Sequence, residues 1–567
     1  MSRFDSLLTR PSRSSEYRQL SQDPVSSRSR VAILRYQREL EQGIRDCQDE
    51  VDGYMARILM LRTKQAGFER EREKFASLLS PIHRMPSETL LEIFGYCCEQ
   101  NLLSEEKIPV ASAISMVCSR WRNVTVSSPR LWSSIKVPFA YHIPPEGLEA
   151  DPDEADSHIS DLMQLRGRLV QSYLERSKTS PLKVVLDFSW HPVYKFRSEH
   201  LLSLLSPSSE RWEELEVLGD GEFYAWGKPN ELDNPSFSLL KRLSLRIRAA
   251  SGIDGVRKVL HKFGDCPVLT TVDLELPDCD DKIMLPWAQV RELRFSECTT
   301  TAAFSPLSSC TSLDSFTLRA LHARNRVWPN EPVVLKTVKS LVLEAGDTPQ
   351  GLNPSALDHL SIPSLSHLEI TTSMAKYGDS TGDGGIIWWN WMDSEHIEAF
   401  IVRSSCNITF LRLQSVFYLT DAVIRLLVLM PKLERLEIDE IKEESTNHVV
   451  SPAFISRLDS MNDSSSETLF LPRLTDLKLA IHVEGLDQQA LSHALMSRCT
   501  PLHKSSGSNG GGGDAICCLR SVDLGLMSTA GASGFVTEHL SSLHCLRNLG
   551  LNLRISHIAV GDFQANF

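Results

Sequence analysis

The sequence predicts an α/β protein in three parts: a long N-terminal helix, a module of three short helices, and an irregular repeat region that forms a parallel sheet. Three observations predict this fold class. Apolar residues recur every three or four positions over residues 31–79, and three short amphipathic segments follow over residues 80–137. A motif of the form apolar-x-x-apolar-x-apolar then occurs twelve times between residues 212 and 551.

Composition bounds the class of protein. At 567 residues the chain is too long for one compact core, and 42% hydrophobic with 23% charged residues is ordinary for a folded protein. The net charge of −12 argues against nucleic acid as a partner, because such binding needs a basic stripe. The longest apolar stretch, residues 422–430, contains Arg425. We therefore expect no membrane span, no membrane partner, and a cytoplasmic or nuclear location.

The cysteines predict neither a metal site nor a disulfide framework. The chain has 13 Cys and no CxxC pair. The adjacent pairs Cys97-Cys98 and Cys517-Cys518 cannot reach a common zinc tetrahedron at the usual ligand spacing. We expect reduced, mostly buried thiols, no metal and no cofactor.

The N-terminal part combines a tail with a long helix. Residues 1–30 are rich in Ser and Arg and lack periodicity, which predicts a disordered tail. Residues 31–79 hold seven heptads and predict a coiled-coil helix of about 70 Å. A dimer and a helix folded back on its own chain both fit. One heptad position holds Ile33, Leu40, Cys47, Tyr54, Leu61, Phe68 and Phe75, and its companion holds Gln37, Ile44, Val51, Ile58, Gln65, Arg72 and Leu79.

Residues 80–137 predict three short helices. Pro86 suits a first helical turn, and apolar residues follow it at i, i+3, i+4 and i+7. A second helix is expected from about Pro109, and Pro129 ends it before a third. So small a module cannot bury all its apolar residues, so some are left for a partner. The three apolar sets are Leu90, Ile93, Phe94 and Cys97; then Ile114, Val117, Trp121 and Val124; then Leu131, Trp132 and Ile135.

The order of these anchors resembles the F-box family. The match runs through Met85, Pro86, Glu88, Leu90, Leu91, Ile93, Phe94, Val117, Cys118, Trp121, Leu131 and Trp132. It departs at Met85, where Leu is usual, and in the longer, more polar interval from Glu99 to Pro109. The resemblance implies docking onto the adaptor subunit of a cullin ubiquitin ligase. The adaptor-binding residues it implies are Pro86, Leu90, Leu91, Ile93, Phe94, Val117, Cys118, Trp121, Leu131 and Trp132, with Leu90, Phe94 and Trp121 partly at a shared interface.

Residues 138–180 predict an acidic connector and a helix. Pro138, Pro144 and Pro145 precede a run of carboxylates, which indicates a solvated linker. A helix is expected from about residue 158 to 177, and Pro181 ends it. The apolar run 182–188 then predicts the first strand of the next unit.

Residues 181–556 contain the repeats. Eight of the eleven spacings between the middle residues of the motifs fall in or near 20 to 29 residues. Each motif predicts a short strand, and the strands together predict a parallel sheet on the concave side of an arc. This part resembles the leucine-rich-repeat family loosely, because the Asn or Cys expected five residues later is mostly absent. The middle residues are Leu215, Leu243, Val272, Leu293, Phe316, Leu341, Leu368, Leu411, Leu436, Leu477, Val522 and Leu549.

Three insertions interrupt the repeats. One holds a Gly-rich run before Trp388, Trp389 and Trp391, and a helix is expected from Asp393. Another surrounds a predicted helix near Ala453, and the third, residues 504–514, predicts a flexible Gly-rich segment. We expect Trp388 and Trp391 to bind the target and Trp389 to be structural, because exposed Trp residues are favoured at protein interfaces. The alternative is that all three tuck under the insertion and cover the repeat core.

Sequence motifs for catalysis are missing. The chain has no HExxH, GxSxG, GxGxxG or GxxxxGK motif, and none of its 17 His lies at a ligand or catalytic spacing from a Cys or carboxylate. We therefore expect no enzyme, and a hydrolase or transferase hidden in the repeats has no named site. The main hypothesis is a substrate-recognition subunit that binds the adaptor, through it the cullin, and an unknown protein substrate. The alternative is a non-ligase scaffold or signalling protein.

Overall fold

The computed structural model divides the chain into two compact units, residues 1–90 and 91–567, with the division falling inside one short helix. The residues that the structure describes are 18, 26–104, 107–142, 152–188, 194–196, 199–219, 236–247, 260–275, 283–322, 328–345, 354–372, 394–414, 420–440, 449–461, 470–483, 486–499, 517–529, 543, 547 and 550–560.

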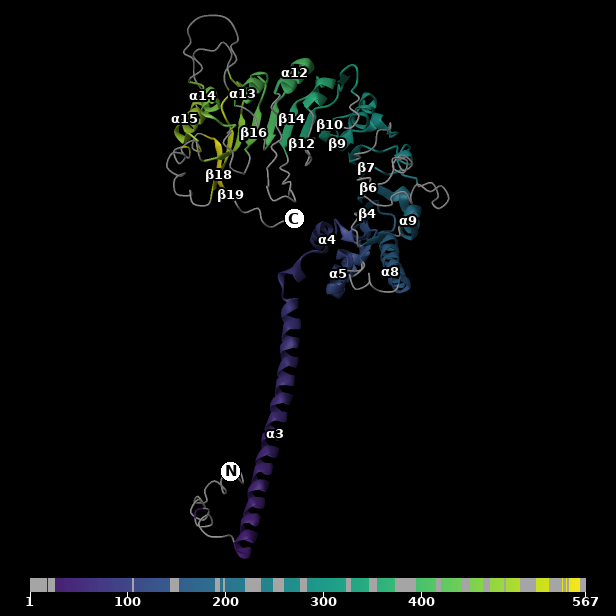
Figure 1. Cartoon of the computed structure of the whole chain (residues 1–567), viewed down its shortest axis with the longest axis vertical. Coiled ribbons are helices and arrows are strands. Elements are labelled where there is room, and N and C mark those ends of the chain that lie inside the picture. The colour runs from purple at the N-terminus through teal and green to yellow at the C-terminus, as the bar shows by residue number, and fades with distance from the viewer. Residues whose placement is uncertain are drawn as a thin grey trace, which may run out of the picture. The chain divides into compact units, whose positions relative to one another are not determined.

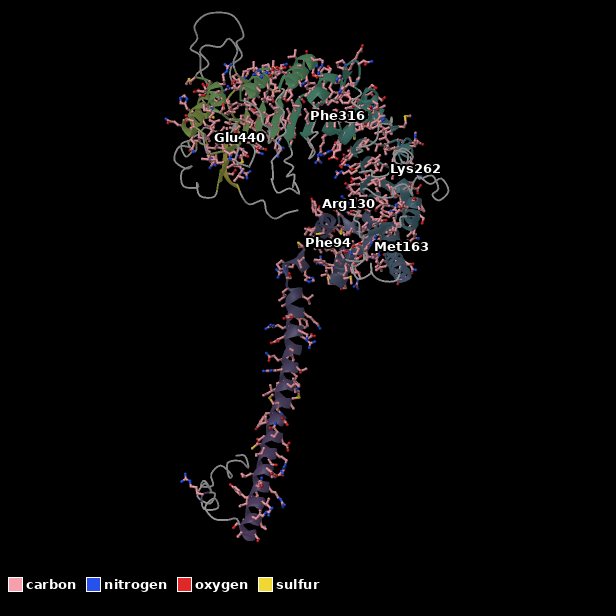
Figure 2. The ribbon with its side chains drawn as sticks, in the orientation of Figure 1. Phe94, Arg130, Met163, Lys262, Phe316 and Glu440 are labelled. Atoms are coloured by element: carbon pink, nitrogen blue, oxygen red, sulfur yellow. The ribbon has the colours of Figure 1, made fainter. Side chains whose placement is uncertain are left out.

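The first unit is built on one long helix, α3 (Ser27–Leu78), of 52 residues. It confirms the predicted N-terminal helix and starts inside the segment predicted as a tail, because the Ser26 hydroxyl accepts a hydrogen bond from the Ser29 N–H at 3.2 Å and caps the first turn. A short 3₁₀ turn, η1 (Pro81–Arg84), follows. The side chains of α3 project outward along its whole length (Figure 2).

The second unit contains a parallel sheet of 15 strands, which confirms the α/β class. Figure 1 shows the strands following one another along an open, curved sheet that does not close into a barrel. The order is β1 (Asn101–Leu102), β2 (Ser134–Pro138), β4 (Leu182–Phe188), β6 (Trp212–Gly219), β7 (Arg242–Arg246), β8 (Thr271–Glu275), β9 (Glu292–Thr299), β10 (Ser315–His322), β12 (Ser340–Ala345), β14 (His367–Thr372), β15 (Phe410–Gln414), β16 (Arg435–Asp439), β17 (Asp476–His482), β18 (Ser521–Thr529) and β19 (Asn552–Val560).

Two small sheets accompany the large one. Strand β3 (Ala140–His142) pairs antiparallel with β5 (Tyr194–Phe196), and β11 (Val333–Val334) pairs parallel with β13 (Leu360–Ser361).

Helices and 3₁₀ turns connect the strands. Figure 1 shows α12 to α15 along the outer side of the sheet. The elements are α4 (Ser87–Cys97), α5 (Val110–Val117), α6 (Ser119–Ser127), η2 (Pro129–Trp132), α8 (Pro152–Ser177), α9 (Glu199–Leu205), η3 (Ser206–Arg211), η5 (Trp287–Gln289), α11 (Thr300–Phe304), η6 (Leu307–Ser309), η7 (Pro354–His359), α12 (Ser394–Ser404), α13 (Thr420–Val428), α14 (Pro452–Leu458) and α15 (Gln488–Cys499).

The middle residues of the first eleven motifs form one continuous row across the sheet. Leu215 lies opposite Leu243, Leu243 opposite Val272, and the pairing continues strand by strand to Val522. All of them are buried, none more than 2% exposed. This row and the apolar residue two positions later in each strand are the core of the sheet, because alternate side chains of a strand point to the same face.

The twelfth motif was predicted in the wrong frame. In the hydrogen-bonded register Val522 lies opposite Leu553, not Leu549, which is outside the described residues. The sequence offers two possible middle residues four positions apart, Leu549 and Leu553. Gly550, at φ +91°, provides the left-handed turn before the strand and so sets the frame at Leu553.

The sheet begins earlier than residue 181. Ile135, expected on a third helix, lies in strand β2, and only the four residues of η2 are helical there. The predicted helix of the acidic connector starts at Pro152 rather than near residue 158. Pro129 permits a single turn, and the alternation of buried Ile135 and Val137 with half-buried neighbours favours a strand over a helix.

Successive repeats are joined by shared backbone carbonyls. The carbonyl oxygen of Lys241 accepts hydrogen bonds from both Thr270 N–H and Thr271 N–H, at 2.9 and 3.0 Å. The same pattern recurs at Arg291, Asp314, Lys339, Ser366, Thr409, Glu434 and Thr475. Turns that lack an asparagine ladder are therefore satisfied through the main chain.

Candidate partner-binding surfaces

Helices α4, α5 and α6 carry most of the predicted adaptor-binding residues, and the structure separates these into three groups. Leu90, Phe94, Leu131 and Trp132 are buried, between 0% and 3% exposed. Leu91, Cys118 and Trp121 are half-buried. Pro86 is exposed, as are Ile93 at 42% and Val117 at 61%.

Leu90 and Phe94, which were expected partly at a shared interface, are both buried in this structure. The ring of Phe94 lies 4.8 Å from that of Trp121, so α4 and α6 pack through these two side chains. Leu90 is 0% exposed. Both side chains therefore lie inside the folded chain rather than on its surface.

Cys118 divides the predicted second helix into two. It has extended backbone, and its Sγ accepts a hydrogen bond from Trp121 N–H at 3.4 Å, which caps α6. The Thr125 hydroxyl then donates to the Trp121 carbonyl at 2.7 Å. These bonds hold Trp121 in place beneath Phe94, so its role in this structure is packing.

Trp132 joins the helical module to the sheet. Its indole N–H donates to the Thr125 carbonyl at 2.9 Å, its ring lies 4.8 Å from Tyr173 of α8, and the Arg176 guanidinium lies 4.3 Å above it. Burial raises the pKa of Tyr173 to about 12, so the phenol stays neutral. Trp132 is therefore a structural anchor.

Two helices of the module expose apolar side chains. Ile93 and Tyr96 lie on neighbouring turns of α4, and Met116 and Val117 end α5. Their exposed fractions are 42%, 77%, 63% and 61%. Tyr96 and Met116 were not predicted as site residues, although both border predicted anchors. We call these four residues the module's apolar set, and apolar side chains this exposed are typical of binding surfaces.

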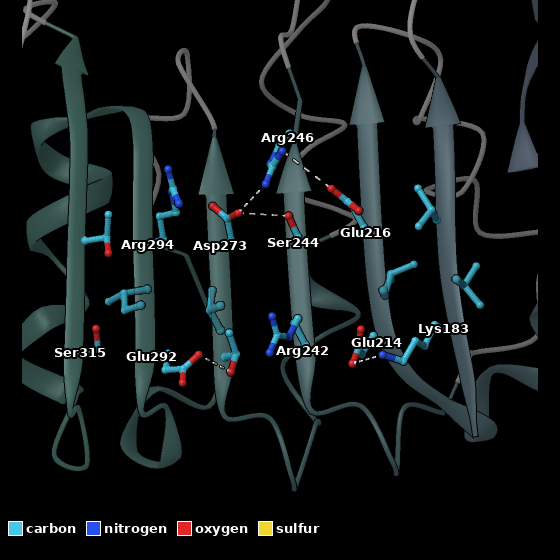
Figure 3. Close-up of a pocket in the computed structure, with 17 residues that line it drawn as sticks. Lys183, Glu214, Glu216, Arg242, Ser244, Arg246, Asp273, Glu292, Arg294 and Ser315 are labelled. Atoms are coloured by element: carbon cyan, nitrogen blue, oxygen red, sulfur yellow. Dashed lines mark hydrogen bonds and ion pairs between the residues drawn. The ribbon is translucent and has the colours of Figure 1, made fainter. Parts of the chain in front are cut away.

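The face of the sheet opposite the connecting helices (Figure 1) is a second candidate surface. Alternate strand residues point away from the core and form rows of polar side chains over β4 to β10 (Figure 3). In the groove that they line, one row reads Lys183, Glu214, Arg242, Thr271, Glu292 and Ser315 from strand to strand.

Most charges in this groove are already paired. Lys183 Nζ lies 2.9 Å from Glu214 Oε1, and Arg246 lies 3.1 Å from Asp273 and 3.8 Å from Glu216. Burial lowers the pKa of Arg246, but these two carboxylates outweigh it and the net direction is upward. Arg242 is exposed and has no ion-pair partner within the described part of the chain. The groove is nearly neutral and suits a polar protein surface better than a strongly charged ligand.

The fold creates two His–carboxylate pairs that sequence spacing did not predict. His396 Nδ1 lies 2.9 Å from Asp358, and His493 Nδ1 lies 2.9 Å from Asp459. The partners are 38 and 34 residues apart, so only the tertiary fold reveals them. Ser497 bonds to the same carboxylate as His493, which differs from the serine–histidine–carboxylate order that a nucleophile requires.

Among the described residues, no group of three or more His, Cys, Asp or Glu could hold a metal ion. Burial raises the pKa of the Cys98, Cys266 and Cys310 thiols to about 12, so these thiols are protonated and poor ligands. No helix in the same residues is long and apolar enough to cross a membrane.

Trp388, Trp389 and Trp391 lie outside the described residues, as do residues 504–514. A scan against models of known protein families finds no match for this chain, and a search of curated proteins finds no relative.

Proposed function

We propose that this chain is the substrate-recognition subunit of a cullin-type (SCF) ubiquitin ligase. In this proposal residues 80–137 form an F-box that binds the adaptor, and a leucine-rich-repeat-like region binds the protein to be ubiquitinated. One observation carries it: the anchors occur in the F-box order on α4, α5, α6 and η2, and Ile93 and Val117 among them are exposed.

The division between buried and exposed anchors supports adaptor docking. Phe94 and Trp132 pack inside the module and stabilise it. The module's apolar set is not used in this packing and remains exposed. Covering several apolar side chains contributes roughly 25 cal/mol per Å² of area removed from water. An adaptor with an apolar groove therefore gains affinity from residues whose replacement does not damage the module.

The test replaces exposed anchors in the full-length chain. Ile93→Glu with Val117→Glu places two charges in the proposed interface and is expected to weaken binding to the purified adaptor about 100-fold or more. Val402→Glu is the matched control, because Val402 of α12 is 63% exposed and lies outside the module. Unchanged adaptor binding by the double variant, or no binding by the natural chain, contradicts the proposal.

Co-purification separates a ligase subunit from the scaffold alternative. A receptor brings down both the adaptor and the cullin from its native cell, and the double variant at Ile93 and Val117 loses both together. A scaffold brings down neither. Recovery of other proteins with no cullin would favour the scaffold.

The target-binding part of the proposal keeps Trp388 and Trp391. Replacing both with Ala is expected to abolish target capture and leave the melting temperature of the sheet unit unchanged. A large fall in the melting temperature assigns these residues to the core instead. Arg242→Ala in the groove is a companion variant, because this exposed arginine is free of ion pairs within the described residues.

A further inference from the structure

Helix α3 carries a long apolar seam that no described residue of its own unit covers. Ile33 is half-buried, and eight further heptad residues are exposed by about half or more of their area: Leu40 51%, Ile44 68%, Val51 51%, Tyr54 62%, Ile58 46%, Leu61 53%, Phe68 75% and Phe75 68%. Helix α3 runs unbroken for 52 residues, so it does not fold back on itself to cover the seam. A seam of this length requires a second helix to cover it.

A parallel pairing of two copies places like charges together. The heptad positions assigned above put Arg72 opposite Arg72 of the second copy in the core. At the flanking positions Arg57 faces Arg62 of the second copy, and only Lys64 with Glu69 is attractive. Gln37 and Gln65 also each face their own copy.

An antiparallel pairing with complete overlap removes the like-charge contacts, and it places Arg72 against Ile33 and Gln65 against Leu40. When Ser27 lies beside Leu78 of the second copy, Ile44 faces Leu61 and Val51 faces Tyr54. At the flanks Glu50 then faces Arg57, and Glu41 faces Arg62. Twofold symmetry repeats each pair, so the antiparallel dimer has four attractive flanking pairs, whereas the parallel dimer has two attractive and two repulsive ones.

Shifting the antiparallel pair by one heptad in either direction is unfavourable. One shift places Glu50 against Glu50 of the second copy, and the other places Arg57 against Arg57. In the single chain Glu41, Arg57 and Arg62 have no ion-pair partner within the described residues, so they are available for these contacts.

The surface of α3 carries a hollow that fits this register. It is lined by Leu61, Lys64, Gln65 and Phe68, together with Glu69 and Arg72. The first four have the i, i+3, i+4, i+7 spacing of the hole that receives a knob in a coiled coil. The antiparallel register places Leu40 of the second copy here, whereas the parallel one places Gln65. We propose that the chain forms an antiparallel homodimer through α3, with residue 27 beside residue 78 of the second copy.

Cross-linking of the full chain distinguishes the registers. In the antiparallel dimer Cys47 faces Ile58 of the second copy, so Ile58→Cys is expected to yield a peptide linking residues 47 and 58 under mild oxidation or with a short bismaleimide. Within one helix these positions are about 16 Å apart and cannot be joined. A link between two copies of Cys47 in the natural chain, or a mass of 63.6 kDa at tens of micromolar by light scattering, overturns the proposal.

A charge swap gives an independent readout. Glu50→Arg brings two Arg–Arg contacts into the antiparallel dimer and is expected to raise its dissociation constant about tenfold. Adding Arg57→Glu restores the opposite charges and the affinity. In the parallel register residue 50 faces Met55, so no effect of Glu50→Arg and no rescue by the second change contradict the antiparallel arrangement. The natural chain, the Glu50→Arg variant and the double variant are compared by sedimentation at the same salt concentration.

Discussion

Helix α3 and the large sheet both arise from periodic apolar residues, yet their side chains end in opposite environments. In the sheet Leu243 and Leu411 are 0% exposed, whereas Leu61 and Phe68 of α3 are 53% and 75% exposed. Neighbouring strands and the described helices and turns that connect them bury the leucines of the sheet. A periodic pattern therefore specifies a helix or a strand, while the residues that cover its apolar face come from elsewhere, either in the same chain or in another molecule.

Removing a buried leucine from the sheet is expected to cause the greatest loss of stability. Leu411→Ala in β15 removes a fully buried side chain and is expected to lower the unfolding free energy of the sheet unit by about 2–5 kcal/mol. All Trp residues lie after residue 90, so Trp fluorescence during denaturation reports this unit alone. Leu61→Ala in α3 is the matched control and should leave that transition unchanged.

A buried arginine provides the next test. Arg498 of α15 is 2% exposed and donates to the carbonyl oxygens of Leu458, Leu471 and Phe470. Arg498→Ala leaves these buried acceptors without a partner and is expected to cost about 3 kcal/mol in unfolding free energy. The unfolding free energy of Arg498→Lys should lie between those of the natural protein and Arg498→Ala, since an ammonium group can donate to some of the three carbonyl oxygens. Equal stability of all three proteins would show that the carbonyls find other donors.

Acid unfolding tests the carboxylate beside α15. Burial raises the pKa of Asp459, but hydrogen bonds from Met461 N–H, His493 and Ser497 outweigh it and hold the pKa below its ordinary value of 3.8. A depressed folded pKa stabilises the protein above the unfolded pKa, and this contribution is lost as pH falls through the folded value. Asp459→Asn should cost about 1 kcal/mol at pH 7. The unfolding free energy of the Asp459→Asn variant should also fall less steeply below pH 4 than that of the natural protein. Equal slopes of unfolding free energy against pH for the two proteins would contradict this.

The smallest expected effect concerns the uncovered helix. Gly53 and Gly67 lie inside α3, and a Cβ added at either meets nothing within 4 Å. Replacing each with Ala is expected to stabilise the helix by about 0.5–1 kcal/mol. Far-ultraviolet circular dichroism should show a higher helix melting temperature, with the Trp fluorescence transition unmoved. A lower helix melting temperature would mean that Gly53 or Gly67 contacts another molecule so closely that an added methyl group disturbs the contact.

Much of the sheet could be predicted from sequence because its pattern has period two and repeats. Eleven motifs aligned in register, since each fixes both the buried face and the first residue of a strand. The twelfth failed because Leu551 belongs to two leucine patterns, and only the hydrogen-bonded pairing of Val522 with Leu553 decides between them.

The candidate adaptor site was less predictable. Ile93 and Phe94 are neighbours on one amphipathic stripe, yet one is 42% and the other 2% exposed. The difference comes from Trp121, which contacts Phe94 from another helix. Sequence periodicity identifies the stripe but does not show which of its residues a distant segment covers. For the same reason the sequence did not predict the contact between His493 and Asp459, which are 34 residues apart in the chain.

The two ends of the sheet differ in a way that bears on how the molecule can be shortened. Strand β1 has two residues, whereas β19 has nine and, within the described residues, no strand beyond it. A long open edge is a template on which the strand of another molecule can add, while a two-residue edge offers almost no template. Truncation after β18 or β17 would create edges of nine or seven residues. Shortened proteins that keep β1 therefore have one long open edge and are expected to associate in pairs through it, unless charged residues are introduced along that edge.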